Sequence, residues 1–431
     1  MNITVVGLGK IGLPLAVQFA GKGHRVIGVD INPALVEEVN AGREPYPGEA
    51  QLAERLAAVV ADGRLRASTD TTAAVAASTA VVVVVPLFVD ADARPDFAAM
   101  DAATRAIGAG LHSGVLVCYE TTLPVGTTRD RWRPLLEEVS GLRAGTDFHV
   151  AFSPERVLTG RVFADLRKYP KLIGALTPEG ARRTREFYEA VLDFDARPDL
   201  TRPNGVWDLG TAEAAEMAKL AETTYRDVNI GLANQFGRFA ASRGIDIYQV
   251  IEASNSQPYS HIHRPGIAVG GHCIPVYPRL YLHTDPDATI VRAAREANLS
   301  MPDYTVGLAQ TAYGDLRGAR VLVLGAAYRG GVKETAFSGA YPTVAALLAR
   351  GARAEVHDPM FTPAELAGLG FEPWPGPESG PVDVAILQAD HPCYRDWTAA
   401  DLPGVQLVVD GRGTLDPARF PGVRVVVVGR G

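Results

Sequence analysis

The residues best suited to covalent chemistry lie in the stretch PGIAVGGHCIPVYP, residues 265–278, where Cys273 follows Gly-Gly-His. Glycines let a ligand approach the backbone closely, and a thiolate in such a loop can attack a carbonyl carbon. The alternative is a cysteine buried as a small hydrophobe, which suits Cys118 in its valine-rich segment better than Cys273. We therefore predict that Cys273 is a nucleophile. His272 adjoins it, but adjacency along the chain implies no contact.

A dinucleotide-binding pattern stands near the start of the chain. Gly7, Gly9 and Gly12 form G-x-G-x-x-G between a predicted strand over residues 2–6 and an apolar-periodic helix, and Asp30 ends the next predicted strand. The glycines permit a tight turn against a pyrophosphate, and the acid can accept hydrogen bonds from a ribose. An acid there repels a 2′-phosphate, so we expect NAD rather than NADP. The alternative is a glycine turn in a sheet that binds nothing, and the flanking elements favour the dinucleotide.

Two further stretches place polar side chains in predicted loops. TTLPVGTT, residues 121–128, follows a predicted strand at its carboxyl end, where doubly wound sheets bind ligands. Its hydroxyls are suited to a ribose, a substrate or a catalytic water, and equally to helix capping. FSPERVLTG, residues 152–160, places Glu155 beside Arg156. Such a pair usually lies in solvent, so it indicates a functional site only together with other candidate site residues.

Lys219 lies inside a predicted long helix over residues 211–243, among alanine, methionine and leucine. Thr223 and Arg226 share its face, because they follow at i+4 and i+7. The alternative is a lysine that snorkels from a partly buried face. Only six of the 42 basic residues are lysines, so we expect each of these positions to need a lysine rather than an arginine.

A dinucleotide site and a nucleophilic cysteine together narrow the chemistry. NAD takes a hydride from an alcohol and leaves an aldehyde, to which a cysteine adds as a thiohemiacetal. A second hydride transfer leaves a thioester, which water hydrolyses to an acid. This combination predicts oxidation of a primary alcohol to a carboxylate at one site.

The elements that must position these residues belong to an α/β fold. Strands alternate with helices in the first part and again in the last third, which predicts two doubly wound, Rossmann-like domains. A helical central region with the one long helix joins them. The last third offers five strand candidates, which are RVLVLG, ARAEVHD, VDVAILQ, VQLVVD and VRVVVV.

The composition bounds the class of protein. The chain has 431 residues, of which 47% are hydrophobic and 21% charged, and its net charge is −7. This balance is typical of a globular protein and disfavours nucleic acid or an anionic membrane as the main partner. The longest apolar run is too short to span a bilayer, and the N-terminus lacks a basic signal-peptide region. Three widely spaced cysteines argue against a disulfide framework and a cysteine-based metal site, so we expect the cytoplasm and no metal.

The sequence resembles the UDP-glucose/GDP-mannose dehydrogenase family over nearly its whole length, nearest the UDP-N-acetylmannosamine and UDP-N-acetylglucosamine 6-dehydrogenases. The stretches that carry the resemblance are VVGLGKIGLPLA, GVDINP, ETTLPVGTT, FSPERVLTG, AEMAKLAETTYRDVNI, HRPGIAVGGHCIPV and VVDGRG. The resemblance implies an NAD-binding domain over residues 1–200, a central helical domain over 201–305 that dimerises through the long helix, and a domain over 306–431 that binds the nucleotide of the sugar.

The resemblance also implies roles for single residues. Cys273 matches the nucleophile, Lys219 the lysine that stabilises an oxyanion, and Thr122 and Glu155 the pair that positions water. The expected cofactor contacts are Gly7, Gly9, Lys10, Ile11, Gly12, Asp30 and Thr122. The expected substrate contacts are Glu155, Arg156, Lys219, Thr223, Arg264, Gly270, Tyr277 and Arg329.

The sequence departs from the family pattern mainly at these substrate positions. The departures are Thr223 for an asparagine, Tyr277 for an aspartate, Arg329 for a lysine, Ala336 for an arginine and Leu87 for a threonine. Tyr277 removes a carboxylate that could keep Lys219 charged, and Thr223 is too short to replace an asparagine's two-ended hydrogen bonding. The second half-reaction depends most on these groups.

Three hypotheses follow. The first is a cytoplasmic, homodimeric NAD-dependent nucleotide-sugar 6-dehydrogenase that forms a uronic acid from a UDP-hexose or UDP-N-acetylhexosamine through Cys273. The second is a divergent oxidoreductase of a specialised pathway, with another substrate or a single two-electron oxidation. The third is a non-catalytic homologue that binds NAD or a nucleotide sugar, which the retention of Cys273, Lys219, Glu155 and Thr122 disfavours.

Overall fold

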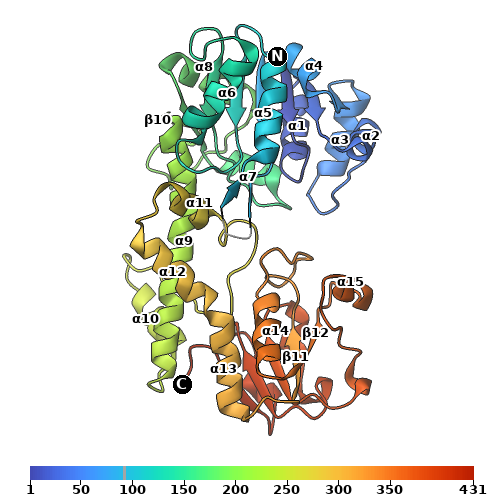
Figure 1. The fold of residues 1–431 in the computed structure, drawn as a ribbon, viewed down its shortest axis with the longest axis vertical. Coiled ribbons are helices and arrows are strands. Elements are labelled where there is room, and N and C mark those ends of the chain that lie inside the picture. The colour runs from blue at the N-terminus through green and yellow to red at the C-terminus, as the bar shows by residue number, and fades with distance from the viewer. Residues whose placement is uncertain (91–93) are drawn as a thin grey trace. The chain divides into compact units, whose positions relative to one another are not determined.

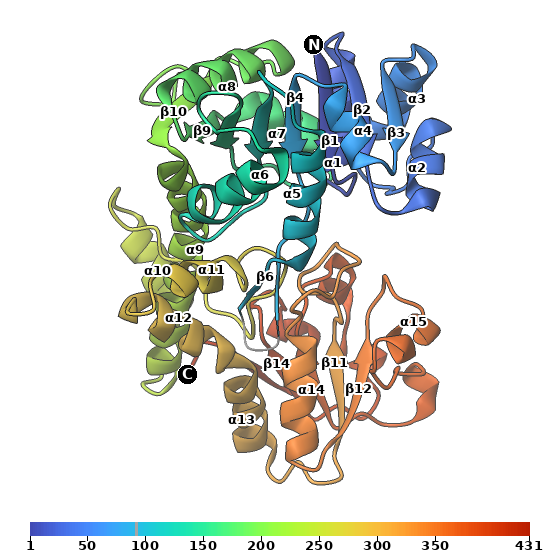
Figure 2. The same ribbon diagram turned by 45° about the horizontal axis from the view of Figure 1, so that its top comes forward.

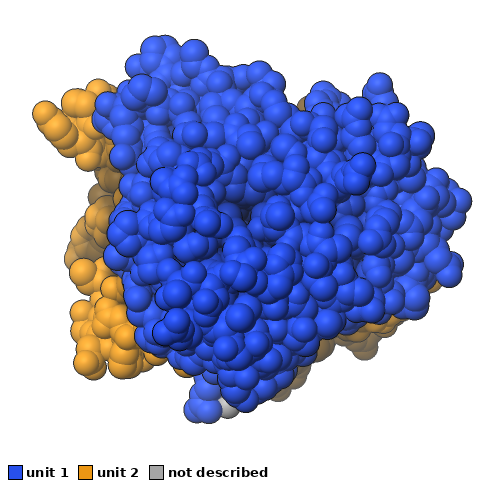
Figure 3. Space-filling view, turned by 90° about the horizontal axis from the view of Figure 1, so that it is seen from above, with its two compact units in different colours: residues 1–222 blue, residues 223–431 orange. Residues whose placement is uncertain are grey.

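The computed structural model describes residues 1–90 and 94–431. The chain forms two compact units, residues 1–222 and 223–431, which Figure 3 colours separately. Each unit contains one large sheet, and the long helix α9 (Ala212–Ala241) begins in the first unit and ends in the second. The three domains expected from the sequence, 1–200, 201–305 and 306–431, remain a prediction.

The sheet of the first unit has eight strands in the order β10-β9-β8-β7-β4-β1-β2-β3. The strands are β1 (Asn2–Val6), β2 (Arg25–Val29), β3 (Leu65–Ser68), β4 (Ala80–Val83), β7 (Leu116–Tyr119), β8 (His149–Phe152), β9 (Lys171–Ala175) and β10 (Val206–Thr211). Neighbouring strands run parallel except β8 and β9, which are antiparallel. The chain leaves β1 for β2 on one side and returns to β4 on the other, so a topological switch point lies at their carboxyl ends. β5 (Phe88–Val89) and β6 (Pro95–Asp96) form a separate antiparallel ribbon.

Helices cover this sheet because its strands are buried on both faces. Figure 1 shows them around the strands. They are α1 (Gly12–Gly21), α2 (Pro33–Asn40), α3 (Leu52–Ala61), α4 (Thr71–Ala76), α5 (Ala98–Gly110), α6 (Arg133–Ser140), α7 (Val162–Lys168) and α8 (Pro178–Val191). In one core, Phe19 of α1 and Phe187 of α8 meet edge to face with ring centroids 5.7 Å apart.

The long helix has the ends that its sequence predicts. The Thr211 hydroxyl accepts a hydrogen bond from the Ala214 backbone N–H at 3.1 Å, as an N-cap does. Gly244 follows the helix with a φ of 67°, a left-handed conformation that glycine adopts without strain. The prediction of one long helix is confirmed.

The second unit contains a five-stranded parallel sheet in the order β12-β11-β13-β14-β15. The strands are β11 (Arg320–Leu324), β12 (Arg353–His357), β13 (Val384–Leu387), β14 (Leu407–Asp410) and β15 (Arg424–Val427), so all five candidates are strands. Alternate residues serve two cores, as Val321 and Val323 face α13 and α14 while Leu322 and Leu324 face the other side. Figure 2 shows α13 and α14 beside this sheet. The unit's remaining helices are α10 (Ile247–Asn255), α11 (Tyr277–Thr284), α12 (Thr289–Leu299), α13 (Met301–Tyr313), α14 (Ala340–Ala349) and α15 (Pro363–Gly368).

Candidate active site

The glycine loop after β1 has the geometry of a dinucleotide cradle. Gly7 has a φ of 93°, and a Cβ on Gly12 would lie 1.8 Å from the Gly7 carbonyl oxygen, so no side chain fits at that point. Asp30 Oδ2 accepts a hydrogen bond from the Leu8 N–H at 2.9 Å, which joins the acid to the loop. Around Gly9 the space is open. The residues therefore fit a pyrophosphate at the N-terminus of α1 and a ribose at Asp30.

A cavity of about 370 Å³ lies beside this loop. Lys10 lines one part of it, and Tyr46, Glu49 and Gly160 line others. Gly160 ends the FSPERVLTG loop, and its N–H donates to Glu49 at 2.6 Å. The glycine loop and the loop that carries Glu155 therefore border one cavity of the first unit.

The loop after β7, which carries Thr122, is anchored at both ends. The Thr121 hydroxyl donates to the Val85 carbonyl oxygen at 2.6 Å. At the other end, the backbone N–H groups of Gly126 and Thr128 donate to the Glu216 carboxylate of α9 at 2.6 and 2.9 Å. Burial raises the pKa of Glu216 to about 7, against these bonds.

The threonines of this loop therefore have structural uses. Thr121 and Thr128 tie the loop to its neighbours, and Thr127 donates to the Pro124 carbonyl oxygen at 2.7 Å. Thr122 is buried next to them. The sequence left open ligand binding and helix capping, but these three hydroxyls donate to other loop and helix groups and form no helix cap. A role in the chemistry remains a prediction for Thr122.

Glu155 belongs to a buried charged set rather than to a solvated pair. Its Oε2 lies 2.9 Å from the Lys171 ammonium of β9, and its Oε1 accepts from the Arg156 N–H at 2.7 Å. Lys171 also contacts Glu120 at 2.8 Å. Burial acts to raise the pKa of Glu155, but the Lys171 charge outweighs it and the pKa is lowered, so this carboxyl is ionised.

Lys219 has a carboxylate partner on its own helix. Its ammonium lies 3.4 Å from Glu222 Oε1, and the other oxygen of Glu222 accepts from the Arg156 guanidinium at 2.9 Å. Lys219 is largely buried. A chain of charges thus joins Lys219 to the loop of Glu155, and Glu222 supplies a carboxylate beside Lys219 although position 277 is a tyrosine.

In the second unit, Cys273 lies exposed in a loop with fixed flanks. The Cys273 carbonyl oxygen accepts from the Tyr277 N–H at 2.9 Å, where α11 begins. On the other side, Gly271 donates to the Ala336 carbonyl oxygen at 2.8 Å, and a Cβ on Gly270 would lie 2.6 Å from Tyr328 Cβ. The glycines are therefore needed for close packing of this loop against residues 328–338. His272 lies 3.4 Å from Glu334.

Buried polar side chains of α9 and α12 support the same loop. Arg295 donates to Asp227 at 2.7 Å and reaches the Ile274 carbonyl oxygen at 3.5 Å. Asn234 accepts from the Gly266 N–H at 2.9 Å, which holds the start of the loop. The backbone on both sides of Cys273 is thus fixed to helices. Arg264 in the same loop lies with its guanidinium 6.0 Å from the Tyr248 ring centre.

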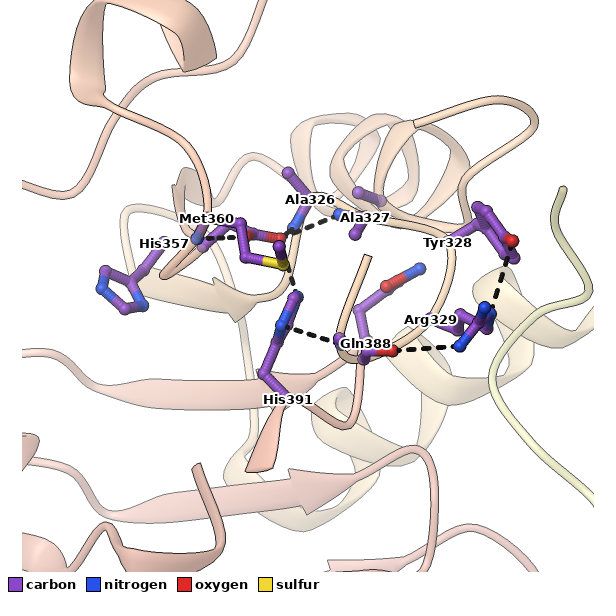
Figure 4. Close-up of polar contacts among 12 residues, drawn as sticks. Ala326, Ala327, Tyr328, Arg329, His357, Met360, Gln388 and His391 are labelled. Atoms are coloured by element: carbon purple, nitrogen blue, oxygen red, sulfur yellow. Dashed lines mark hydrogen bonds and ion pairs between the residues drawn. The ribbon is translucent and has the colours of Figure 1, made fainter. Parts of the chain in front are cut away.

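The loop after β11 carries Arg329, which is exposed and donates to the Tyr328 hydroxyl at 3.3 Å (Figure 4). Arg412 is half-buried and donates to the backbone carbonyl oxygens of Tyr328, Ala268 and Gln388. Arg412 therefore joins the Arg329 loop to the loop of Gly270 and Cys273.

Asp358, directly after β12, holds the first residues of the loop after β11. It accepts from the N–H groups of Ala326 and Ala327 and from His391 at 3.0 Å (Figure 4). Burial acts to raise the pKa of Asp358, but the bond from His391 and the backbone bonds outweigh it and lower the pKa. The loop that precedes Arg329 is thereby held by a buried carboxylate.

The structure brings some predicted site residues together within a unit. Asp30 joins the glycine loop, Lys219 is linked through Glu222 to Arg156 beside Glu155, and Gly270 packs beside the Arg329 loop. Thr223 is buried on α9 one turn after Lys219. Cys118 is 1% exposed, which confirms it as a packed hydrophobe.

Sequence reasoning missed several polar residues that hold the site. They are Glu120, Lys171, Tyr188, Glu216, Glu222, Asp227, Arg295 and Arg412. One signal was available for Lys171, because lysine is scarce in this chain. The others depend on which strands and helices become neighbours.

Within residues 1–90 and 94–431, no helix combines the length and apolar character that a bilayer crossing needs. In the same described residues, no cluster of His, Cys, Asp and Glu is arranged to hold a metal ion.

Family models match three consecutive parts of the chain. The NAD binding domain of the UDP-glucose/GDP-mannose dehydrogenase family matches residues 1–192, the central domain matches 213–300, and the UDP binding domain matches 322–417. These ranges contain the glycine loop, the Cys273 loop and the Arg329 loop in turn.

Individual relatives agree with this assignment. UDP-N-acetyl-D-mannosamine dehydrogenase of Pyrococcus horikoshii is 36% identical over 423 residues, which cover 96% of both chains. The solved structure of UDP-D-ManNAc dehydrogenase from the same organism covers 100% of both chains with a TM-score of 0.87 and 31% identity. An NDP-N-acetyl-D-galactosaminuronic acid dehydrogenase from Methanosarcina mazei covers 99% of this chain and 95% of its own, with a TM-score of 0.87 and 29% identity. The chain thus belongs to the UDP-glucose/GDP-mannose dehydrogenase family and is an NAD-dependent nucleotide-sugar dehydrogenase.

Proposed function

We propose that this enzyme oxidises the C6 alcohol of a UDP-N-acetylhexosamine to a carboxylate, in two hydride transfers at one site. The observation that carries the proposal is Cys273, an exposed thiol whose loop is held on both flanks by backbone bonds and close glycine packing. A dehydrogenase that stopped at an aldehyde or ketone would have no use for a fixed thiol. The UDP-N-acetylmannosamine dehydrogenases among the relatives support an N-acetylhexosamine as substrate.

The cofactor side of the reaction uses the first unit. Gly7, Gly9 and Gly12 would hold the pyrophosphate, with Lys10 and Ile11 in the same turn, and Asp30 would bind the ribose. NAD, when bound, accepts one hydride from the substrate carbon in each of the two oxidations. Asp30 favours NAD over NADP because its charge repels a 2′-phosphate.

The covalent side would proceed through Cys273. After the first oxidation, its Sγ adds to the aldehyde carbon and the carbonyl oxygen takes a proton, which gives a thiohemiacetal. After the second, the carbon is a thioester. Water then attacks that carbon, the C–S bond breaks, and the acid leaves with the thiol restored.

Charged and hydroxyl-bearing residues would stabilise the developing oxyanion and position the attacking water in these steps. The Lys219 ammonium is suited to the developing oxyanion, and its contact with Glu222 at 3.4 Å helps to fix its position. Ionised Glu155, with Thr122, would orient the attacking water and take its proton. Substrate contacts beyond these are proposed for Arg156, Thr223, Arg264, Gly270, Tyr277 and Arg329.

We further propose that two copies pair through α9. The helix presents Met217, Tyr225, Leu232, Phe236 and Phe239 to solvent, each at least 38% exposed. Their spacing places them on one stripe of a helix, and an exposed apolar stripe of this length is typical of an interface. The cytoplasm remains the proposed compartment, because the chain has three widely spaced cysteines.

The test is the number of NADH released per sugar consumed, measured with UDP-N-acetylmannosamine, UDP-N-acetylglucosamine and other nucleotide hexoses. We expect two NADH and a product 14 Da heavier than the substrate, since CH2OH becomes COOH (~14 Da). One NADH per sugar, with a loss of two hydrogens, would contradict the proposal.

That contrary result would support the second hypothesis. Tyr277 and Thr223 are the observations that favour it, because they replace an aspartate and an asparagine of the family pattern. The enzyme would then perform a single two-electron oxidation within a specialised pathway.

A further inference from the structure

A buried cluster of ionisable groups lies behind Glu155. The Lys171 ammonium is 2.8 Å from Glu120 Oε2 and 2.9 Å from Glu155 Oε2. The Tyr188 hydroxyl donates to the other oxygen of Glu120 at 2.6 Å, and its ring lies 4.8 Å from the ammonium. Glu120 follows β7, Lys171 begins β9 and Tyr188 lies on α8, so three separate elements converge on this point.

The cluster carries more negative than positive charge in a place that excludes water. Glu120 is 1% exposed and Lys171 is 4% exposed, while the Glu155 side chain is 11% exposed. Charges this deep are tolerated only when paired, and here two carboxylates share one ammonium. One of the two carboxyls must therefore hold a proton more readily than an ordinary glutamate.

The surroundings decide which carboxyl stays charged. Glu155 receives both the Lys171 ammonium and the Arg156 N–H, and its pKa is lowered despite burial. Burial raises the pKa of Glu120, which lies deeper. Lys171 keeps its charge, because the two carboxylates outweigh the effect of burial and raise its pKa.

We propose that Lys171 is a positioning residue for the reaction, which fixes one oxygen of Glu155 and keeps that carboxylate ionised. The proposal rests on the proposed function, in which Glu155 orients water and takes its proton. Glu120 is the second carboxyl of the cluster, and its burial makes it the one that more readily takes a proton. The alternative is a salt bridge that only ties β7, β9 and α8 together.

Three variants separate these roles. Lys171→Met removes the charge at similar length, and Lys171→Arg keeps it. Lys168→Met is the matched control, because Lys168 is an exposed lysine three residues earlier in the chain. Thermal unfolding of all three identifies any general loss of fold. The rate of acid formation is then measured from pH 5.5 to 9.5.

The pH profile is the decisive readout. The titratable groups that face Glu155 and Glu120 are Lys171, Tyr188 and Cys118. Without the ammonium, the two carboxyls share a proton, so Glu155 is ionised only at higher pH. The pH below which kcat falls should therefore rise by about one unit or more, and kcat at neutral pH should fall about tenfold. The rate should recover at high pH, with the KM for NAD unchanged. Lys171→Arg should restore most of the rate.

A double variant tests the charge argument directly. Lys171→Met combined with Glu120→Gln removes the competing carboxyl and supplies an amide that can donate to Glu155. We expect the acid limb to return toward that of the unchanged enzyme. A rate lowered equally at every pH, with no recovery in the double variant or in Lys171→Arg, would overturn the proposal.

A measurement without substrate tests the role of Lys171 independently of the proposed reaction. Infrared difference spectra of Lys171→Met against Lys171→Met/Glu155→Gln report whether Glu155 is protonated at neutral pH. The carbonyl stretch of a protonated Glu155 should appear in Lys171→Met and be absent when Lys171 is present. If the unchanged enzyme forms no acid, the proposed function fails while this spectrum still decides the role of Lys171, and an ionised Glu155 in Lys171→Met would overturn it.

Discussion

At the scale of single residues, Asp30 is the residue that we propose sets the cofactor preference. The carboxylate is held by the Leu8 and Asn32 N–H groups, which fixes its direction beside the glycine loop. A ribose binds more tightly to a carboxylate that is already fixed than to a mobile one, because the side chain then loses less conformational freedom on binding. We therefore propose that Asp30 contributes to NAD affinity and to rejection of NADP.

Replacing Asp30 should weaken NAD binding without stopping the chemistry. A hydrogen bond to a charged group contributes about 1.5–3 kcal/mol, so Asp30→Ala should raise the Kd for NAD roughly tenfold to a hundredfold. Fluorescence titration with NADH and the KM for NAD measure the effect. Asp70→Ala is a suitable control, because Asp70 caps α4 outside the site. Unchanged NAD affinity in Asp30→Ala would show that the ribose binds elsewhere.

The sequence was informative about residues whose pattern is local. The glycine loop, Asp30 and Cys273 lie in short motifs whose spacing alone points to their chemistry. Lys171 and Glu120 are 51 positions apart and meet only because β7, β8 and β9 become neighbours in the sheet. No local pattern records such a pair, so this part of the site could not be predicted.

At the scale of elements, α9 and the loop after β7 depend on each other through Glu216. Three groups donate to this buried carboxylate, which are the Gly126 and Thr128 N–H groups and the Thr128 hydroxyl. They fix the loop that presents Thr122. Since burial raises the pKa of Glu216 to about 7, the folded protein binds a proton there that the unfolded chain releases near pH 4.5.

The contribution of Glu216 to the stability of the fold should therefore fall as pH rises from about 4.5 to about 7. A carboxyl with a raised folded pKa contributes most below its unfolded pKa and loses that contribution above its folded pKa. For Glu216 the loss amounts to about 3 kcal/mol between pH 4.5 and 8. Glu216→Gln, which cannot titrate, should show a smaller decrease in Tm from pH 5.5 to 8.5 than the unchanged protein. Equal decreases in both proteins would contradict this role.

The strands were predictable for a physical reason. Buried parallel strands are continuous apolar runs, so β1, β4, β7, β11, β13 and β14 stand out in the sequence. β12 at the edge of the second sheet reads RAEVH, and its place in the strand–helix alternation is what predicts it. β3 and β10 at the sheet edge have mixed sequences, LRAS and VWDLGT, which carry no such signal. The order of the strands, and with it the meeting of distant loops, follows from packing of the whole unit.

At the scale of the whole molecule, we predict a dimer that depends on the apolar stripe of α9. A charge placed in that stripe should separate the copies, because it would be buried unpaired at the interface. Phe239 is 57% exposed, and Phe239→Glu should give a monomer by light scattering. Leu348→Glu is the matched control, since Leu348 is equally exposed on α14. A dimer in both variants would mean that the copies pair through another face, and a monomeric unchanged protein would exclude the dimer.

The chain as a whole is a dehydrogenase in which the cofactor cradle and the thiol lie in different units. Its departures from the family pattern concern mainly residues that we propose to contact the substrate, and they leave Cys273 in place. We therefore predict complete oxidation to the acid, with the thiol as the covalent carrier.

The most direct test of this central claim is acid formation by Cys273→Ala, assayed beside the unchanged enzyme with NAD and a UDP-N-acetylhexosamine. NAD binding should be retained, because the cradle lies in the first unit. We predict that the variant forms no acid, while the unchanged enzyme releases two NADH per sugar. Acid formation by Cys273→Ala at the rate of the unchanged enzyme would contradict the covalent mechanism.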